Sequence, residues 1–227
     1  MSAPILLVHG AWHGAWAWAT LEKHLDASER RIVAVDLPSS GVDPGMLGGL
    51  DADVDAVRRA RDRLDDPAIV VGHSYGGQVI TEAAAGRDDV AHLVYVCAFV
   101  LDEGESLLSA LDGEIPDWIS VSEDGASSSV VRPAEVFYAD VDDGVASTSA
   151  DRLGHQSIAS FSAELTAAAW REVASTYVLC EQDRAIPPPA QEAMAQRTGT
   201  VHRLDSSHSP FLSMPERLAG IIESVDA

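Results

Sequence analysis

Residues 68–83, AIVVGHSYGGQVITEA, join an apolar run, a glycine-rich turn and a helical pattern in that order. The run 68–72 predicts a buried strand, and the residues after Gly76 predict a helix. Between them, Gly72-His73-Ser74-Tyr75-Gly76 matches the pattern G-x-S-x-G. So sharp a turn needs small residues on both sides of the serine, strains its backbone by about 1–3 kcal/mol and exposes its hydroxyl. The sequence therefore predicts a nucleophilic serine here, rather than an ordinary turn with a solvent-facing serine.

Five further runs predict strands that alternate with helical patterns along the chain. They cover residues 5–8, 31–36, 93–98, 176–180 and 201–204, and an example of a helical pattern between them is 53–64. Parallel strands need crossover connections, which are usually helices, and such sheets are covered on both faces. We therefore predict an α/β fold with a mainly parallel six-stranded sheet and helices on both faces. Ligands of such folds bind at the carboxyl ends of the strands.

The chain has 227 residues, of which 46% are hydrophobic and 22% charged, as expected of one domain with its own core. We expect a core of residues 1–101 and 162–227, interrupted by a lid at about 102–161. That segment has few strand patterns, and its 13 acidic residues against two arginines give it −11 of the net charge of −21. The alternative is a disordered acidic insert, against which Trp118, Phe137 and Tyr138 supply apolar anchors.

The acidic excess also limits the partners of the protein. Nucleic-acid binding depends on clustered Lys and Arg, which the chain lacks, and no apolar run is long enough to span a membrane. No signal-peptide pattern precedes residue 10, so we expect a cytoplasmic protein in which Cys97 and Cys180 are reduced. We expect no cofactor and no metal, and the sequence indicates no particular oligomeric state.

A nucleophilic serine needs a histidine base. We choose His208, which follows the run 201–204 in a loop at the carboxyl end of a strand. His202 lies inside that run and His155 lies in the lid, so they are weaker candidates.

The histidine in turn needs a carboxylate that orients its ring. Asp183 follows the run 176–180 and stands just before Ile186-Pro187, so it is our choice. Glu181 and Asp102 remain alternatives, because either could face the same edge of the sheet.

Acyl transfer also needs backbone N–H groups that bind the oxyanion. The N–H of Ala11, after the first strand, and that of Tyr75, at the start of the next helix, are the candidates. The pair His9 and His13 has metal-ligand spacing for a helix, but the glycine after each indicates a loop and argues against a metal. Apolar side chains that could complete a substrate pocket are Trp12, Phe99, Trp118, Phe137, Tyr138 and Phe211.

Four segments carry a resemblance to a known family: HGAWHGAW (9–16), DLPSSGVD (36–43), GHSYGG (72–77) and CEQDRAIP (180–187). With them the chain resembles the α/β-hydrolase superfamily over nearly its whole length. It is most similar to the branch of plant salicylate-type methylesterases and hydroxynitrile lyases. The resemblance implies that Ser74, Asp183 and His208 form a catalytic triad and that Ala11 and Tyr75 provide the oxyanion hole.

Two positions bear on which activity of that branch to expect. The lyases carry a hydroxyl residue after the first His-Gly-like pair and a lysine after the catalytic histidine, where this chain has Ala11 and Ser209. We therefore expect a carboxylesterase-type hydrolase, with a neutral small-molecule ester as its partner and an acidic lid that disfavours anionic substrates. The alternatives are cyanohydrin cleavage and a non-catalytic ligand-binding protein of the same fold.

Overall fold

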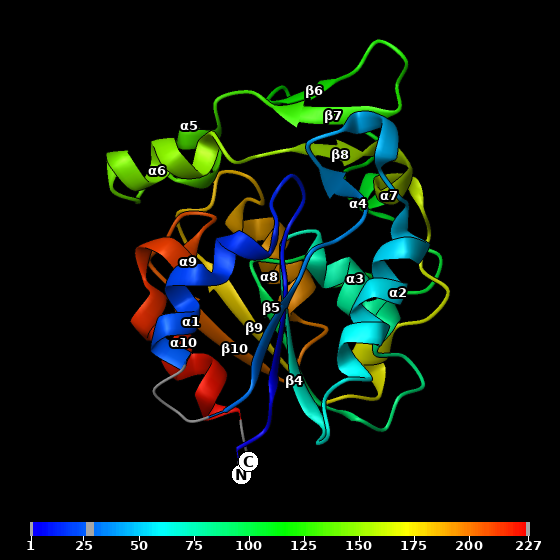
Figure 1. Ribbon diagram of the computed structural model, residues 1–227, viewed down its shortest axis with the longest axis vertical. Coiled ribbons are helices and arrows are strands. Elements are labelled where there is room, and N and C mark those ends of the chain that lie inside the picture. The colour runs from blue at the N-terminus through cyan, green and yellow to red at the C-terminus, as the bar shows by residue number, and fades with distance from the viewer. Residues whose placement is uncertain (1, 26–29, 226–227) are drawn as a thin grey trace.

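The computed structural model describes residues 2–25 and 30–225, and its centre is a six-stranded sheet (Figure 1). The strand order is β10-β9-β5-β4-β1-β2, and all neighbours pair in parallel, as predicted. The strands are β1 (Ile5–Val8), β2 (Ile32–Val35), β4 (Ala68–His73), β5 (Val90–Val96), β9 (Ser175–Cys180) and β10 (Thr200–Leu204). The predicted six-stranded parallel sheet is confirmed.

Several boundaries differ from the sequence-based expectation by one to three residues, and the largest differences are in β5 and α2. β5 ends at Val96 rather than at residue 98, because Cys97 has a left-handed φ of 35° and turns the chain away from the sheet. The helix expected at 53–64 is α2 (Leu50–Arg61), which begins directly after Gly49.

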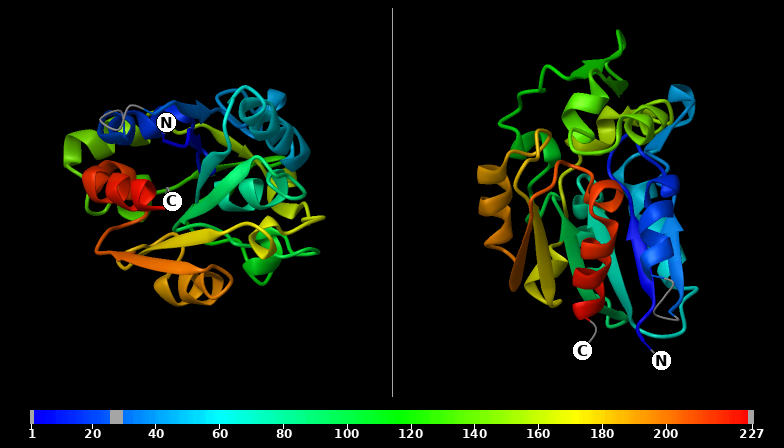
Figure 2. Two further views of the ribbon diagram at one scale, coloured as in Figure 1. Left: turned by 90° about the horizontal axis from the view of Figure 1, so that it is seen from below. Right: turned by 90° about the vertical axis from the view of Figure 1, so that its left-hand side faces the viewer.

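Helices cover both faces of this sheet (Figure 2). One face carries α1 (Ala19–Leu25), α9 (Pro210–Ser213) and α10 (Pro215–Ser224), and the other carries α2, α3 (Gly76–Ala83) and α8 (Pro188–Ala195). Strand β1 shows the reason. Its Ile5 and Leu7 belong to the core beneath α1, α9 and α10, and its Leu6 and Val8 belong to the core beneath α2, α3 and α8. Successive side chains of a strand point to opposite faces, so a fully apolar strand supplies two cores at once.

The 102–161 segment lies over one end of the sheet, as Figures 1 and 2 show. Its elements are α4 (Leu107–Ala110), β6 (Ile119–Val121), β7 (Ser127–Val130), α5 (Pro133–Phe137), α6 (Asp143–Ala150), β8 (His155–Ser157) and α7 (Ile158–Ser162). Its three strands form an antiparallel sheet with β3 (Ser40–Gly41), in the order β3-β8-β7-β6. Three-residue and four-residue strands rich in serine give little sequence signal, so the sequence analysis missed them. The remaining elements are the short 3-10 helices η1 (Ala15–Trp18), η3 (Pro44–Met46) and η4 (Ala169–Arg171).

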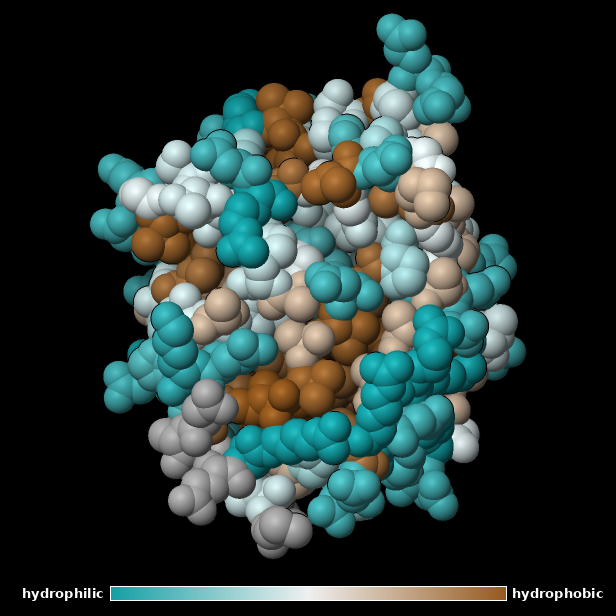
Figure 3. All heavy atoms as spheres, viewed as in Figure 1, coloured by the Kyte–Doolittle hydropathy of each residue, from teal (hydrophilic) through white to brown (hydrophobic). Residues whose placement is uncertain are grey.

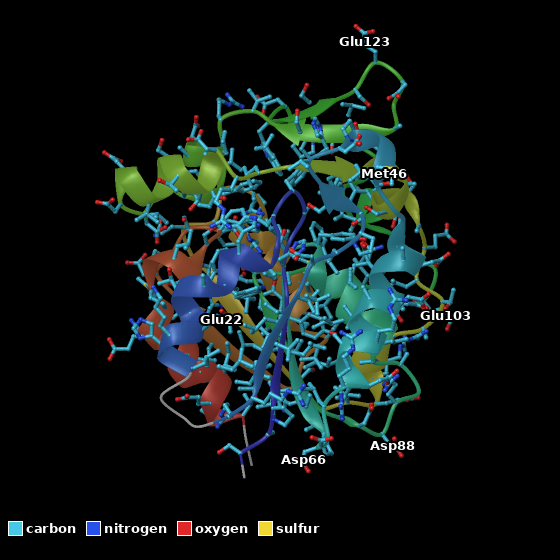
Figure 4. The ribbon with its side chains drawn as sticks, viewed as in Figure 1. Glu22, Met46, Asp66, Asp88, Glu103 and Glu123 are labelled. Atoms are coloured by element: carbon cyan, nitrogen blue, oxygen red, sulfur yellow. The ribbon has the colours of Figure 1, made fainter. Side chains whose placement is uncertain are left out.

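The surface combines acidic side chains with a few apolar ones. Figure 4 shows Glu103 and Glu123 of the 102–161 segment pointing away from the molecule. Figure 3 shows apolar side chains gathered between α1 and α2, where the edge strand β2 carries half-buried residues. Cys97 and Cys180 are buried and form no disulfide. Within residues 2–25 and 30–225, no helix has the length and apolar character needed to cross a bilayer.

One buried cation stabilises the end of the sheet opposite the 102–161 segment. The Arg61 guanidinium donates hydrogen bonds to the carbonyl oxygens of Asp89 (2.6 Å), Leu64 (2.9 Å) and Asp66 (2.9 Å). These carbonyls belong to the loops that lead into β4 and β5.

We expect Arg61→Met to lower the free energy of unfolding by about 2–4 kcal/mol, because it leaves the Leu64 and Asp66 carbonyls without this donor and leaves the Asp89 carbonyl with the Ala68 N–H alone. Arg59→Met in the same helix removes only an exposed pair with Asp55, so it should cost less than about 0.5 kcal/mol. Urea denaturation of the two variants measures both values. Equal losses would contradict the role given to Arg61.

Candidate active site

Ser74 lies in the turn between β4 and α3, with a left-handed φ of 52°. Its N–H donates to the Val96 carbonyl (3.2 Å), which ties the turn to the neighbouring strand. A Cβ on Gly76 would lie 2.7 Å from the carbonyl oxygens of Val8 and His9, so only glycine fits there against β1. The strained conformation is the one that the G-x-S-x-G pattern requires.

His208 and Asp183 meet at the carboxyl ends of β10 and β9. The His208 Nδ1 lies 2.7 Å from the Asp183 Oδ2, and both side chains are almost fully buried. Asp183 also accepts from the N–H groups of Ala185 (2.7 Å) and Ile186 (3.0 Å) and from Gln191 Nε2 (3.0 Å). A carboxylate with these donors is an acceptor, so Nδ1 of the neutral imidazole carries the proton and Nε2 is left as the basic nitrogen.

The four alternatives from the sequence lie elsewhere. Asp102 forms an ion pair with Arg171, and Glu181 is an exposed partner of Arg203. His155 lies on β8 of the second sheet, and His202 lies within β10.

His73 connects the serine turn to the His208 loop. Its Nε2 donates to the His208 carbonyl (2.8 Å), and the two rings are 4.6 Å apart. Burial, with neighbouring His208 and His13, holds the pKa of His73 well below its usual value, so this ring is neutral. Its hydrogen bond places the loop of His208 against the residue that precedes Ser74.

The two amides expected to bind an oxyanion, those of Ala11 and Tyr75, face no protein acceptor. Both residues line one cavity together with Ser74. Among the described residues, neither N–H donates a hydrogen bond to a protein atom. Two free donors beside a strained serine are what a tetrahedral oxyanion requires.

The model of the alpha/beta hydrolase family matches residues 5–221. The chain belongs to the α/β-hydrolase family. It is 31% identical over 238 residues to the alpha/beta hydrolase nvfD of Aspergillus novofumigatus, covering 97% of this chain and 95% of that protein. It is 36% identical over 104 residues to methylesterase 7 of Arabidopsis thaliana, covering 43% of this chain and 40% of that protein. Among solved structures, a pyrethroid hydrolase matches with a TM-score of 0.85 at 25% identity, over 100% of this chain and 99% of that chain. The predicted family is confirmed.

In this hydrolase the 102–161 segment holds the loop that carries Ala11. Trp12, the next residue, has a left-handed φ of 62°, and its N–H donates to Gln156 Oε1 (3.2 Å). Its carbonyl accepts from the Gly154 N–H (2.8 Å), and its indole Nε1 donates to the Ser128 carbonyl and hydroxyl (3.2 Å each). Gln156 was not predicted, because it stands in no motif and its partner Trp12 is 144 residues away.

Asp53 holds Tyr75, whose N–H is the other amide expected to bind an oxyanion. The Tyr75 hydroxyl donates to Asp53 Oδ2 (2.6 Å), and the N–H and hydroxyl of Ser39 donate to the same carboxyl group (2.8 and 2.5 Å). Gln156 Nε2 donates to the Ser39 hydroxyl (2.7 Å), so the networks around Ala11 and Tyr75 are continuous. Asp53 is fully buried and has only neutral donors, and this burial raises its pKa to about 6. Its place in an ordinary helical pattern gave no sign of this role.

The cavity at Ser74 is apolar and small, with a volume of about 30 Å³. Of the residues expected to form a pocket, Trp12, Phe99, Trp118 and Phe137 line it. The other two lie elsewhere. The Tyr138 hydroxyl is 2.9 Å from His13 Nε2, and Phe211 packs between Trp18 and His73. Lining residues that the sequence analysis did not identify are Leu107, Leu111, Pro116, Ile119, Phe161, Ala185 and Ile186.

The histidines considered as metal ligands have other partners. His9 accepts from the Leu37 N–H (3.0 Å), and His13 contacts Tyr138 and the Ala11 carbonyl. Burial lowers the pKa of His9 to about 4 and that of His13 to about 3, so both rings are neutral. His73, Cys97 and His208 also cluster within 4.8 Å. In this cluster the His73 Nε2 and the Cys97 Sγ both donate to the His208 carbonyl (2.8 and 3.4 Å), and burial raises the pKa of the Cys97 thiol well above its usual value.

The raised pKa of Asp53 predicts that the free energy of unfolding depends on pH. Because its folded-state pKa of about 6 lies above its ordinary value of 3.8, folding takes up a proton between these pH values. The contribution of Asp53 to stability therefore falls as the pH rises from 4 to 7, by about 2 kcal/mol. We expect the difference in unfolding free energy between wild type and Asp53→Asn to decrease by that amount over this range. Asp51→Asn, an exposed change in the same helix, should show no such trend, and parallel curves for wild type and Asp53→Asn would contradict the assignment.

Proposed function

We propose that this hydrolase cleaves neutral small-molecule carboxylic esters through an acyl-enzyme on Ser74. The observation that carries the proposal is that a strained serine turn and two free amides line one apolar cavity, with the buried His208–Asp183 pair beside it. The His208 ring lies 5.4 Å from the ring of Phe137, which lines the same cavity. We also propose the division into a core (1–101 and 162–227) and a lid (102–161). The likeness to a methylesterase and a pyrethroid hydrolase supports ester chemistry.

The chemistry follows from these positions. The Ser74 Oγ attacks the ester carbonyl carbon while His208 Nε2 takes its proton. Asp183 holds Nδ1–H and stabilises the imidazolium, and the N–H groups of Ala11 and Tyr75 bind the oxyanion. The tetrahedral intermediate collapses, and His208 returns the proton to the leaving alcohol. Water, activated by the same histidine, then hydrolyses the acyl-enzyme and releases the carboxylic acid and Ser74.

The residues at the two positions that distinguish the lyases favour hydrolysis over cyanohydrin cleavage. Ala11 offers no hydroxyl, and Ser209, next to His208, offers no positive charge to a leaving cyanide. Ser209 is fully buried, and its hydroxyl has no partner among the described residues. Release of cyanide from mandelonitrile would favour the lyase alternative, whereas release of acid from simple esters favours the esterase.

We expect Ser74→Ala to lower kcat on any hydrolysed ester by about 10⁴–10⁶-fold, because it removes the nucleophile. A fluorophosphonate probe should label wild type and the exposed-site control Ser147→Ala, and it should not label Ser74→Ala. Mass spectrometry of the labelled peptide and ester kinetics measure both effects. Labelling at another serine, or no labelling of the folded wild type, would contradict an assembled triad.

The negative charge of the proposed lid predicts that salt affects the hydrolysis of anionic esters. Its 13 acidic residues should repel an anionic ester at low ionic strength, and salt should screen the repulsion. Raising the ionic strength from about 0.01 to 0.15 M should increase kcat/KM for monoethyl succinate roughly threefold to tenfold. Ethyl valerate, which is neutral and of similar size, serves as the control and should change by less than about twofold. Equal salt effects on the two esters would contradict the expectation.

A further inference from the structure

Two apolar cavities of very different size lie side by side. The cavity at Ser74 has about 30 Å³, which holds only a few heavy atoms. A second cavity of about 700 Å³ opens to the surface between the α4 region and α8, and it lies within the range of ordinary ligand sites. We call them the inner and the outer cavity.

The two cavities share a wall. Phe99, Leu111, Ala185 and Ile186 line both of them. We propose that the outer cavity binds one long uncharged apolar arm of the ester, acyl or alcohol, while the reacting carbonyl and a small second arm occupy the inner cavity. This inference rests on the proposed function and specifies its substrate class.

Three members of the wall are fixed to the catalytic core. The N–H groups of Ala185 and Ile186 donate to Asp183 Oδ1, and the Phe99 N–H donates to the Ser74 carbonyl (3.1 Å). Leu111 instead belongs to the 102–161 segment. It is half-buried and is followed by Asp112 with a left-handed φ of 54°. In the described part of the chain, the Leu111 backbone bonds only to Leu107, Leu108 and Glu114 of its own segment, so of the four wall residues it is the one that we expect to move aside for a substrate.

The outer cavity suits an arm without charge. Among the described residues that line it, Glu105 and Arg197 are the ionic ones, and Arg197 donates two hydrogen bonds to Glu105 (2.5 and 2.7 Å). Arg197 also donates to the Val100 carbonyl (2.8 Å). The hydrogen bonds from Arg197 lower the pKa of Glu105, so the pair stays ionised and self-neutralised. Apart from Ser109, the other side chains that line the cavity are apolar, with Leu101, Pro187 and Met194 as the larger ones.

The test uses two ester series in a pH-stat assay: methyl esters of acetic to decanoic acid, and acetates of methanol to decanol. In one series, kcat/KM of the wild type should rise with arm length, and that series identifies the arm that binds in the outer cavity. Ala190→Trp places an indole in the outer cavity from an exposed position of α8, away from Ser74. We expect it to lower the long-to-short ratio of kcat/KM at least tenfold, whereas Ala134→Trp, on α5 and outside both cavities, leaves the ratio unchanged. Leu111→Ala should raise the ratio severalfold.

A binding measurement separates this inference from the proposed function. The neutral dye N-phenyl-1-naphthylamine should bind wild type and Ser74→Ala with equal affinity, and Ala190→Trp should weaken it at least tenfold. Dye binding that follows this pattern in a protein that hydrolyses no ester would refute the esterase and retain the cavity. Unchanged length selectivity and unchanged dye affinity in Ala190→Trp, in a protein that does hydrolyse esters, would overturn the outer cavity and retain the esterase.

Discussion

The buried hydrogen bond between His208 and Asp183 is the interaction on which the rest of the site depends. It joins the loops after β10 and β9, which are neighbours in the sheet, and it forms where neither side chain reaches water. A buried carboxylate is costly unless its oxygens are satisfied, and three further donors satisfy those of Asp183. His73 at the end of β4 donates to the His208 carbonyl, so hydrogen bonds link the loop after β9 to the serine turn after β4 through His208.

A second buried network supports the two amides proposed to bind an oxyanion, and its described members include no cation. Trp12 and Tyr75 are held through Gln156, Ser39 and Asp53, which lie on three different parts of the chain. Because their neighbours are fixed by other bonds, the two amides can remain free for a substrate oxygen. The arrangement has a cost, since the Asp53 carboxylate is buried among neutral donors and its pKa rises accordingly. If the two amides bind an oxyanion as proposed, this network orients these donors before charge develops, which is electrostatic preorganisation.

The parts that the sequence predicted are those that local pattern determines. Apolar runs identified all six strands of the parallel sheet, and glycine spacing identified the turn at Ser74. Parallel strands end at one edge, so a histidine and an aspartate that each follow a strand were good candidates to meet. The missed features depend on distant partners. Gln156 bonds Trp12 from a three-residue strand, and Phe137 and Tyr138 are adjacent, yet only Phe137 lines the inner cavity. No local pattern shows which member of such a pair faces the serine.

The 102–161 segment acts differently at its two ends. At the β8 end, Gln156 and Gly154 bind Trp12, so lifting that end would break hydrogen bonds that orient the loop of Ala11 and Trp12. Near α4, the turn with Leu111 contributes one wall of the inner cavity and is anchored beside it by the Glu105–Arg197 pair. A substrate that enters by displacing the Leu111 side chain leaves the loop of Ala11 and Trp12 undisturbed. A substrate that lifted the whole segment would break the hydrogen bonds that orient that loop. Access from the α4–α8 side is therefore the route that keeps the hydrogen bonds around the two amides proposed to bind an oxyanion.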